Sequence, residues 1–279
     1  MSRQQIPVAL VAAPIPALAV GVVVMHASGV SATLWSQNVA AALLGSLLCV
    51  AAAARERSRG ADAAVPRFVV VGIAALVATF VAPGIDGVHR WIGIGPLRLH
   101  VAATVLPAML AVLSDSEPGR RAAVYGPIVV SALLFAQPDA AQASAFAVAW
   151  AVAARTSRHT REAGGALVVL ALAAATWFRA DSLAPVPYVE GILRLAQTQG
   201  AGLAAAGGLS LVLLPLPFLL DPRQRALGAA VAAYLLCTVL VPVVGNYPVP
   251  VMGYGVAPIL GYYAGAAAFM LGSRHPAPA

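Results

Sequence analysis

The ionisable side chains that could do chemistry lie in four short polar segments between long apolar stretches. These segments are residues 84–100, 137–139, 179–200 and 244–255. They carry the charged candidates Arg90, Asp139, Glu190 and Arg194. A carboxylate can accept a proton as a general base, and a guanidinium group binds phosphate oxygens through paired hydrogen bonds. We therefore expect any active site or binding site to be built from these segments.

Each candidate also has a purely structural interpretation. Arg90 and Trp91 can anchor the chain at the membrane interface, Arg90 by reaching lipid phosphates. Asp139 can cap the helix that follows it. In the third segment, apolar residues at helical spacing predict a short helix in the membrane surface, on which Glu190 and Arg194 form an i,i+4 pair. The fourth segment is rich in Pro and Gly and can be only a turn.

The composition excludes a soluble protein. Of the 279 residues, 61% are apolar and 10% are charged, and the mean hydropathy is +0.86. An average soluble domain is about 45–50% apolar and about 25% charged. Each membrane-spanning helix needs about 20 apolar residues. We therefore expect an all-α, polytopic membrane bundle that forms one transmembrane domain over residues 1–279.

Hydropathy predicts ten membrane spans. They cover residues 7–26, 34–54, 68–83, 99–113, 122–136, 140–154, 163–178, 201–220, 226–244 and 254–271. The first span has no cleavage motif, so we expect it to be retained. With a cytoplasmic N-terminus, 13 of the 17 arginines lie inside, and only Arg90, Arg98, Arg179 and Arg194 lie outside. The positive-inside rule then predicts that both termini are cytoplasmic and that all four polar segments face outward.

Other residue patterns narrow the function. The net charge of +7 follows from this topology, so we expect no nucleic-acid partner. Cys49 and Cys237 lie in apolar runs, and the five histidines have no ligand spacing, so we expect neither a disulfide framework nor a metal site. Gly261 and Gly265 form a small-xxx-small pair, which fits either packing within the chain or a dimer face.

Taken in order, the polar segments resemble motifs of the SEDS family (shape, elongation, division and sporulation), the polytopic peptidoglycan glycosyltransferases of bacterial cell walls. HRWI at 89–92 with GP at 95–96 resembles the family's RRWI…GP loop. QPD at 137–139 resembles its QPDLGT motif, and residues 248–255 resemble LPFISYGG. The resemblance runs over roughly residues 70–265.

The chain also departs from the family pattern. After GP the family continues into QPSE, whereas residues 99–102 are LHVA. The large outer loop is reduced, and residues 187–193 stand where the family has PEAHTDFIF. This placement puts Glu190 at the position of the family's catalytic aspartate.

The resemblance implies a multi-pass protein of the bacterial inner membrane that polymerises polyprenyl-pyrophosphate-linked sugars at the outer leaflet. It implies Glu190 as the base, Arg90 and Arg194 as pyrophosphate ligands, Asp139 as a residue that positions the site, and Trp91 in substrate binding. It also implies membrane lipids and a membrane protein as partners, and it indicates no particular cofactor. A non-catalytic lipid-carrier binder, flippase or division or elongation scaffold is the alternative, since it needs the same segments without a base.

Overall fold

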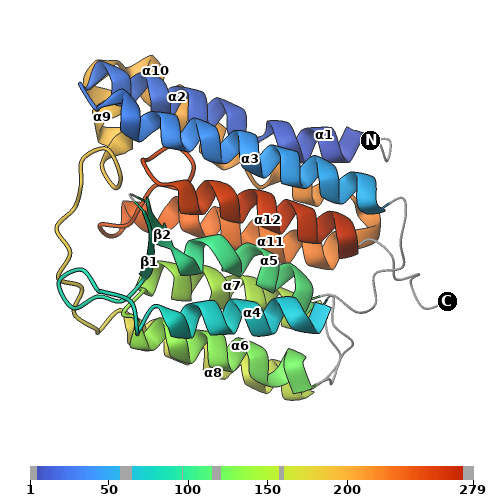
Figure 1. Cartoon of the computed structure of the whole chain (residues 1–279). Coiled ribbons are helices and arrows are strands. Elements are labelled where there is room, and N and C mark those ends of the chain that lie inside the picture. Colours follow the sequence, from blue (N-terminus) through green and yellow to red (C-terminus); the bar gives the residue numbers. More distant parts are fainter. Residues whose placement is uncertain (1–4, 57–64, 96, 115–120, 157–159, 273–279) are drawn as a thin grey trace.

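Long apolar helices lie side by side in the computed structural model, which describes residues 5–56, 65–95, 97–114, 121–156 and 160–272 (Figure 1). The α-helices are α1 (Gln5–Ala12), α2 (Pro14–Ala27), α3 (Ala32–Glu56), α4 (Val65–Ala78), α5 (Val101–Ser114), α6 (Arg121–Ala136), α7 (Ala140–Thr156), α8 (Thr160–Thr176), α9 (Ile192–Gln199), α10 (Ala201–Leu213), α11 (Arg225–Leu240) and α12 (Val256–Gly272). Short 3₁₀ helices follow α10 (η1, Leu216–Leu219; η2, Pro222–Gln224) and α11 (η3, Val241–Val243).

The predicted spans and the helices agree. The first span is divided into α1 and α2 just before Pro14, whose nitrogen has no hydrogen to donate within a helix. The other nine spans correspond to α3 to α8 and α10 to α12, and α9 is the predicted short helix of the third polar segment. Among the described residues, four stretches are long and apolar enough to cross a membrane, and five shorter helices are also apolar. The all-α membrane fold is confirmed.

The polar segments meet at one end of this bundle. In Figure 1 the β-strands and α9 lie at the left end, whereas α1 begins and α12 ends at the right. This is the sidedness that the arginine pattern predicts. Residues 57–64, 115–120 and 157–159, which hold several of the arginines expected inside, lie outside the described residues. Which end faces the cytoplasm stays a prediction.

The hydropathy pattern did not predict a β-hairpin at this end. Strand β1 (Trp91–Ile94) pairs antiparallel with β2 (Leu97–His100), with Trp91 opposite His100. Gly95 turns the chain at a φ of 59°, a conformation that glycine adopts without steric cost. Pro96, part of the GP motif, lies outside the described residues. Two four-residue runs around a Gly-Pro pair are a hairpin signal that could have been used.

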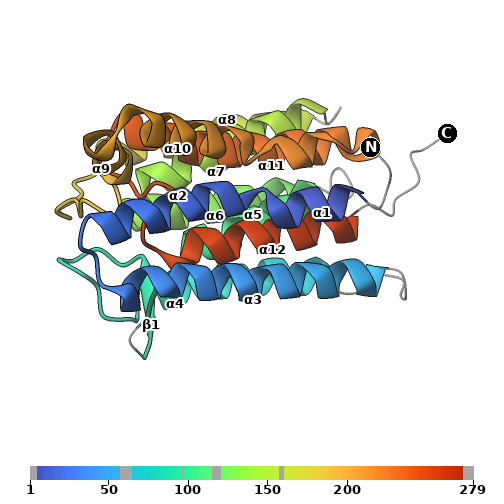
Figure 2. The same ribbon diagram turned by 90° about the horizontal axis from the view of Figure 1, so that it is seen from above.

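The glycine pair of α12 serves packing within the chain. A Cβ atom on Gly261 would lie 1.9 Å from the carbonyl oxygen of Ala103, and one on Gly265 would lie 2.8 Å from Pro107 Cβ. Both glycines therefore let α12 approach α5 closely, as small residues do between membrane helices. The intramolecular alternative is confirmed and the dimer-face alternative is wrong for this pair. Figure 2 shows the helices from above, with α12 running between α3 on one side and α1 and α2 on the other.

Candidate functional site

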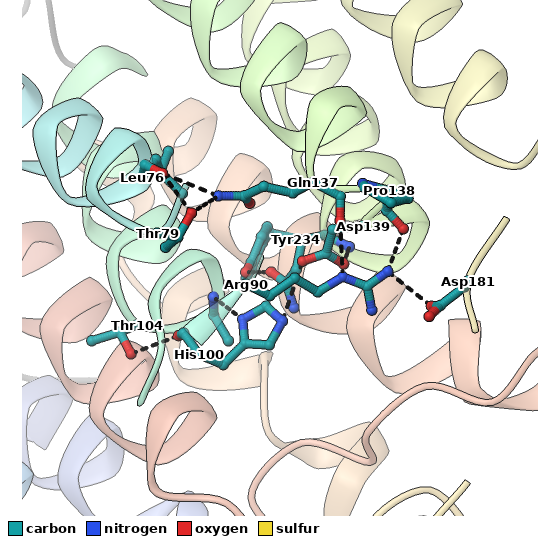
Figure 3. Close-up of polar contacts among 12 residues, drawn as sticks. Leu76, Thr79, Arg90, His100, Thr104, Gln137, Pro138, Asp139, Asp181 and Tyr234 are labelled. Carbon is teal, nitrogen blue, oxygen red and sulfur yellow. Dashed lines mark hydrogen bonds and ion pairs between the residues drawn. The ribbon is translucent and has the colours of Figure 1, made fainter. Parts of the chain in front are cut away.

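A buried guanidinium group joins three of the polar segments at this end. Arg90 is only 5% exposed, although it directly precedes β1 in a loop. Its Nε donates to the carbonyl oxygen of Gln137 at 3.1 Å, and its Nη2 donates to that of Pro138. Nη2 also forms an ion pair with Asp181 Oδ2 at 2.8 Å (Figure 3). Arg90 thus links the hairpin, the corner between α6 and α7, and the loop after α8.

Gln137 anchors the same corner to a further helix. Its Nε2 donates to Thr79 Oγ1 at 2.7 Å and to the carbonyl oxygen of Leu76 at 3.2 Å. Both acceptors lie at the C-terminal end of α4. Gln137 is 1% exposed, so these bonds satisfy its buried NH2 group and fix the backbone carbonyl that Arg90 contacts, whereas its Oε1 has no hydrogen-bond partner among the described residues. The QP part of the QPD motif is therefore a structural junction in this chain.

Asp139 lies beside Arg90 at the start of α7. Its Oδ1 accepts from the backbone N–H of Gln142 at 3.2 Å, which is the geometry of a helix N-cap. The capping interpretation is confirmed. His100 Nε2 lies 3.2 Å from Asp139 Oδ2, while the backbone N–H of Ala103 donates to His100 Nδ1 at 3.2 Å. Because Nδ1 is the acceptor, the proton of a neutral ring is on Nε2 and faces the carboxylate.

The charge of Asp139 is compensated by its neighbours. Burial alone would raise the pKa of this 2% exposed carboxyl, but Arg90 and His100 act against burial and hold its pKa below the ordinary value of 3.8. The hydroxyl of Tyr234, from α11, donates to the side-chain oxygen of Gln142 next to this site. Asp139 is therefore an ionised group held by neighbouring charges and is poorly suited to take up a proton.

Glu190 lies in a turn just before α9. Its Oε2 accepts from the backbone N–H of Val186 at 2.6 Å, and its own N–H donates to the carbonyl oxygen of Val186 at 3.1 Å. Since α9 begins only at Ile192, Glu190 is outside the helix, and no ion pair between Glu190 and Arg194 forms among the described residues. The predicted i,i+4 pair is wrong.

The environment of Glu190 makes its carboxyl group a weaker acid than that of an exposed glutamate. Half-burial raises the pKa of its carboxyl above the ordinary 4.5, the negative charge of Asp181 raises it further, and backbone hydrogen bonds oppose both. Among the ion pairs of the described residues, none includes Glu190. The carboxylate is consequently a stronger base than an exposed glutamate.

Trp91 and Arg194 are the two remaining candidates. Trp91 is half-buried, and its ring packs edge to face against His100 with the ring centres 5.3 Å apart. Arg194 is exposed on α9, four positions after Glu190 in the sequence. The structure therefore brings Arg90, Asp139 and Trp91 together around His100. It places Glu190 and Arg194 in a neighbouring region, and the substrate-binding roles stay predictions.

Several residues of this end had no signal in the sequence. Asp181 was one acidic residue in a polar loop, and nothing indicated that it pairs with Arg90. The spacing of the histidines predicts no metal site and indicates no other role for His100. Tyr247 belongs to a small buried cluster with Ala140, Ala141 and Val241, and its pKa is raised by burial and by the charges of Asp181 and Asp139. Among the described residues, no group of three His, Cys, Asp or Glu side chains is placed to hold a metal ion.

Comparison with known proteins identifies the fold. The chain has a TM-score of 0.69 to the crystal structure of the rod shape determining protein RodA of Thermus thermophilus, at 21% identity, covering 96% of this chain and 95% of RodA. The fold is that of RodA. A mutant form of the same RodA gives a TM-score of 0.67 at 21% identity, covering 96% of both chains. No family model matches the sequence, and no curated protein matches it.

A third solved structure has the same RodA-like fold. It is described under the words "structural coordination of polymerization and crosslinking by a peptidoglycan synthase complex", and it has a TM-score of 0.63 at 20% identity, with 95% of this chain and 96% of that chain covered. RodA is a SEDS protein, so the fold expected from the SEDS-like motifs is confirmed. A RodA-like bundle also supports the predicted location, a multi-pass protein of the bacterial inner membrane.

Proposed function

We propose that this chain is a SEDS-like membrane protein of peptidoglycan synthesis that polymerises polyprenyl-pyrophosphate-linked sugars, with Glu190 as the general base. The observation that carries the proposal is the half-buried Glu190 carboxylate, whose pKa is raised, in a RodA-like bundle. A base is most effective when its pKa approaches the working pH, and burial moves Glu190 in that direction. The complex in which one similar structure was solved supports a membrane protein as partner.

The proposed step is a glycosyl transfer. Glu190 takes the proton of the acceptor sugar's hydroxyl, and the oxygen then forms a bond to the anomeric carbon of the donor. The bond from that carbon to the pyrophosphate oxygen breaks, and the lipid pyrophosphate leaves with the electron pair. Cations near the leaving group stabilise its charge in the transition state.

The contacts divide the two arginines between different tasks in this step. Arg194 is exposed on α9, four positions after Glu190 in the sequence, and a guanidinium binds pyrophosphate oxygens in a bidentate manner. Arg90 is buried and already bonded to two carbonyl oxygens and Asp181, so it braces the loops that surround the site. Asp139 and Trp91 would act beside it, Asp139 by fixing the α7 corner and Trp91 by offering an aromatic surface.

A second candidate is a non-catalytic binder, flippase or scaffold for lipid-linked sugars. One observation favours it: Glu190 Oε2 is held by the Val186 N–H at 2.6 Å, and a base must keep a free oxygen for its substrate. Because a carboxylate has a second oxygen, this contact still leaves Oε1 for the acceptor hydroxyl. The two functions therefore differ in whether removing the carboxylate abolishes turnover.

The test is polymerisation of a polyprenyl-pyrophosphate-linked disaccharide by purified protein. Glu190→Gln keeps the side-chain shape and should lower the rate by about 10²–10⁴-fold while binding of the donor is retained. Asp86→Asn is the matched control, because it removes an exposed carboxylate from the same end of the bundle. Its rate should stay within about twofold of wild type. An unchanged rate for Glu190→Gln would reject Glu190 as the base, and donor binding without any turnover by wild type would favour the second candidate.

A further inference from the structure

One buried amide, far from Glu190 in the sequence, secures the loop against which the Glu190 turn is built. Asn38 is on α3 and is fully buried. Its Nδ2 donates to the carbonyl oxygen of Gly253 at 2.9 Å, and its Oδ1 accepts from the N–H of Gly255 at 3.0 Å. Both the NH2 group and the oxygen of the amide thus form hydrogen bonds to the segment between α11 and α12. A buried amide with both partners satisfied fixes the backbone that it contacts.

The segment held by Asn38 has a backbone that needs support. Val251 has a φ of 65°, a conformation that a β-branched residue rarely adopts and that costs free energy unless the surroundings impose it. Gly253 is packed so tightly that a Cβ atom there would lie 2.5 Å from the carbonyl oxygen of Val189 and 2.9 Å from that of Val249. The segment is consequently pressed against the residue that precedes Glu190.

Two hydrogen bonds carry this constraint to the Glu190 turn. The N–H of Val249 donates to the carbonyl oxygen of Val189 at 3.2 Å, and the N–H of Tyr254 donates to that of Tyr188 at 2.9 Å. The two residues directly before Glu190 are therefore attached to the segment that Asn38 holds. Asn38 has no contact with Glu190 itself among those described.

We propose that Asn38 is a positioning residue for Glu190, acting through residues 249–255 and the backbone of residues 188–189. This inference rests on the proposed function for its effect on turnover, but the coupling between the two segments is independent of it. Without the amide, the segment loses two of its side-chain bonds to α3 and keeps the one that the Tyr254 hydroxyl donates to Gln37 Oε1. The turn is then held less firmly against the segment. A displacement of about 1 Å at a reacting group can lower the rate by about 10²-fold.

The activity test separates positioning from a general role in folding. Asn38→Ala, in the purified full-length protein, should lower kcat for the lipid-linked disaccharide by about 10–10²-fold and change KM by less than about threefold. The pH at which the rate falls on the acid side should also move, because burial of Glu190 sets its pKa. Asn246→Ala is the matched control, since it removes an exposed amide from the same connection and should leave both parameters unchanged.

Hydrogen exchange tests the coupling without relying on activity. In Asn38→Ala, backbone amides in residues 186–191 and 249–255 should exchange at least about tenfold faster, while those of the β1–β2 hairpin keep the wild-type rate. Acceleration confined to residues 249–255, or an equal acceleration of the hairpin, overturns the inference. If wild type does not polymerise the donor, the proposed function fails, and the exchange result alone decides the positioning role.

A second variant covers the case in which Asn38→Ala does not fold. Gly253→Ala breaks the same connection from the segment side, because its Cβ would meet the carbonyl oxygen of Val189. It should also lower kcat and accelerate exchange in residues 186–191. Gly208→Ala, at a position where an added Cβ meets nothing within 4 Å, is its control. Wild-type kcat and exchange in Gly253→Ala would overturn the inference.

Discussion

Two neighbouring regions at one end of the bundle shift the pKa of a carboxyl group in opposite directions. Around Arg90, the carboxyl groups of Asp139 and Asp181 lie beside a guanidinium, and the pKa of Asp139 is lowered. In the turn before α9, Glu190 receives only backbone hydrogen bonds among its described contacts, and its pKa is raised. Charges that neutralise one another hold segments together, whereas a carboxylate without a cation keeps the basicity that proton transfer requires.

Residues of similar type have different roles in the two regions. In one region they hold the fold together, and in the other they are available for chemistry. Arg90 and Asp139 resemble family motif residues, yet their atoms are largely engaged by the chain itself, by carbonyl oxygens, a helix cap and a histidine. Glu190 and Arg194 form fewer contacts within the chain. Glu190 lies in the turn before α9, and Arg194 lies on α9. Three predictions test this division, from the largest expected effect to the smallest.

The first prediction is that both regions face outward, which is required if they serve a substrate at the outer leaflet. With Cys49 and Cys237 replaced by alanine, Ala184→Cys should react with a membrane-impermeant thiol reagent in intact cells. Arg223→Cys, at the other end of the bundle, should react only after permeabilisation. The effect is all or none because the membrane blocks the reagent. Labelling of both sites in intact cells, or of Arg223→Cys alone, would contradict the topology.

The second prediction concerns stability. Arg90→Met should lower the free energy of unfolding by about 2–3 kcal/mol, because it leaves two carbonyl oxygens and Asp181 without their cation. This loss is smaller than that for a fully buried ion pair, because Asp181 is partly exposed. Arg98→Ala, an exposed arginine on the same hairpin, is the control and should cost less than about 0.5 kcal/mol. Thermal unfolding in detergent measures both. An equal loss of unfolding free energy in Arg90→Met and Arg98→Ala would contradict the bracing role of Arg90.

The third prediction concerns pH. Turnover requires ionised Glu190, so kcat/KM should fall as the pH drops through its pKa, which lies above 4.5. Asp181→Asn removes a charge that raises this pKa, so the fall should move to lower pH. The stability that ionised Asp139 contributes is present above 3.8 and is lost only as the pH falls through its lower folded pKa. Activity should therefore be lost at a higher pH than stability, and the reverse order would contradict the division.

The sequence by itself determined the class of fold. Apolar stretches long enough to cross a bilayer must form helices there, because lipid offers no partner for backbone polar groups. Their number and the arginine asymmetry also predicted that the four polar segments gather at one end, which Figure 1 shows. The capping role of Asp139 was equally predictable, since an N-cap depends on residues only three positions apart.

Only the tertiary structure decided which polar groups meet. The ion pair of Arg90 with Asp181 joins residues 91 positions apart, and the Asn38 amide reaches a segment 215 residues away. Such pairs depend on how the helices pack and leave no periodic trace in the sequence. Packing also buried Arg90 in a set of bonds and left Arg194 exposed on α9, although nothing in the sequence indicates that the two arginines differ in this way. Burial and the nearest charge set what an ionisable group can do, and both are properties of the folded chain.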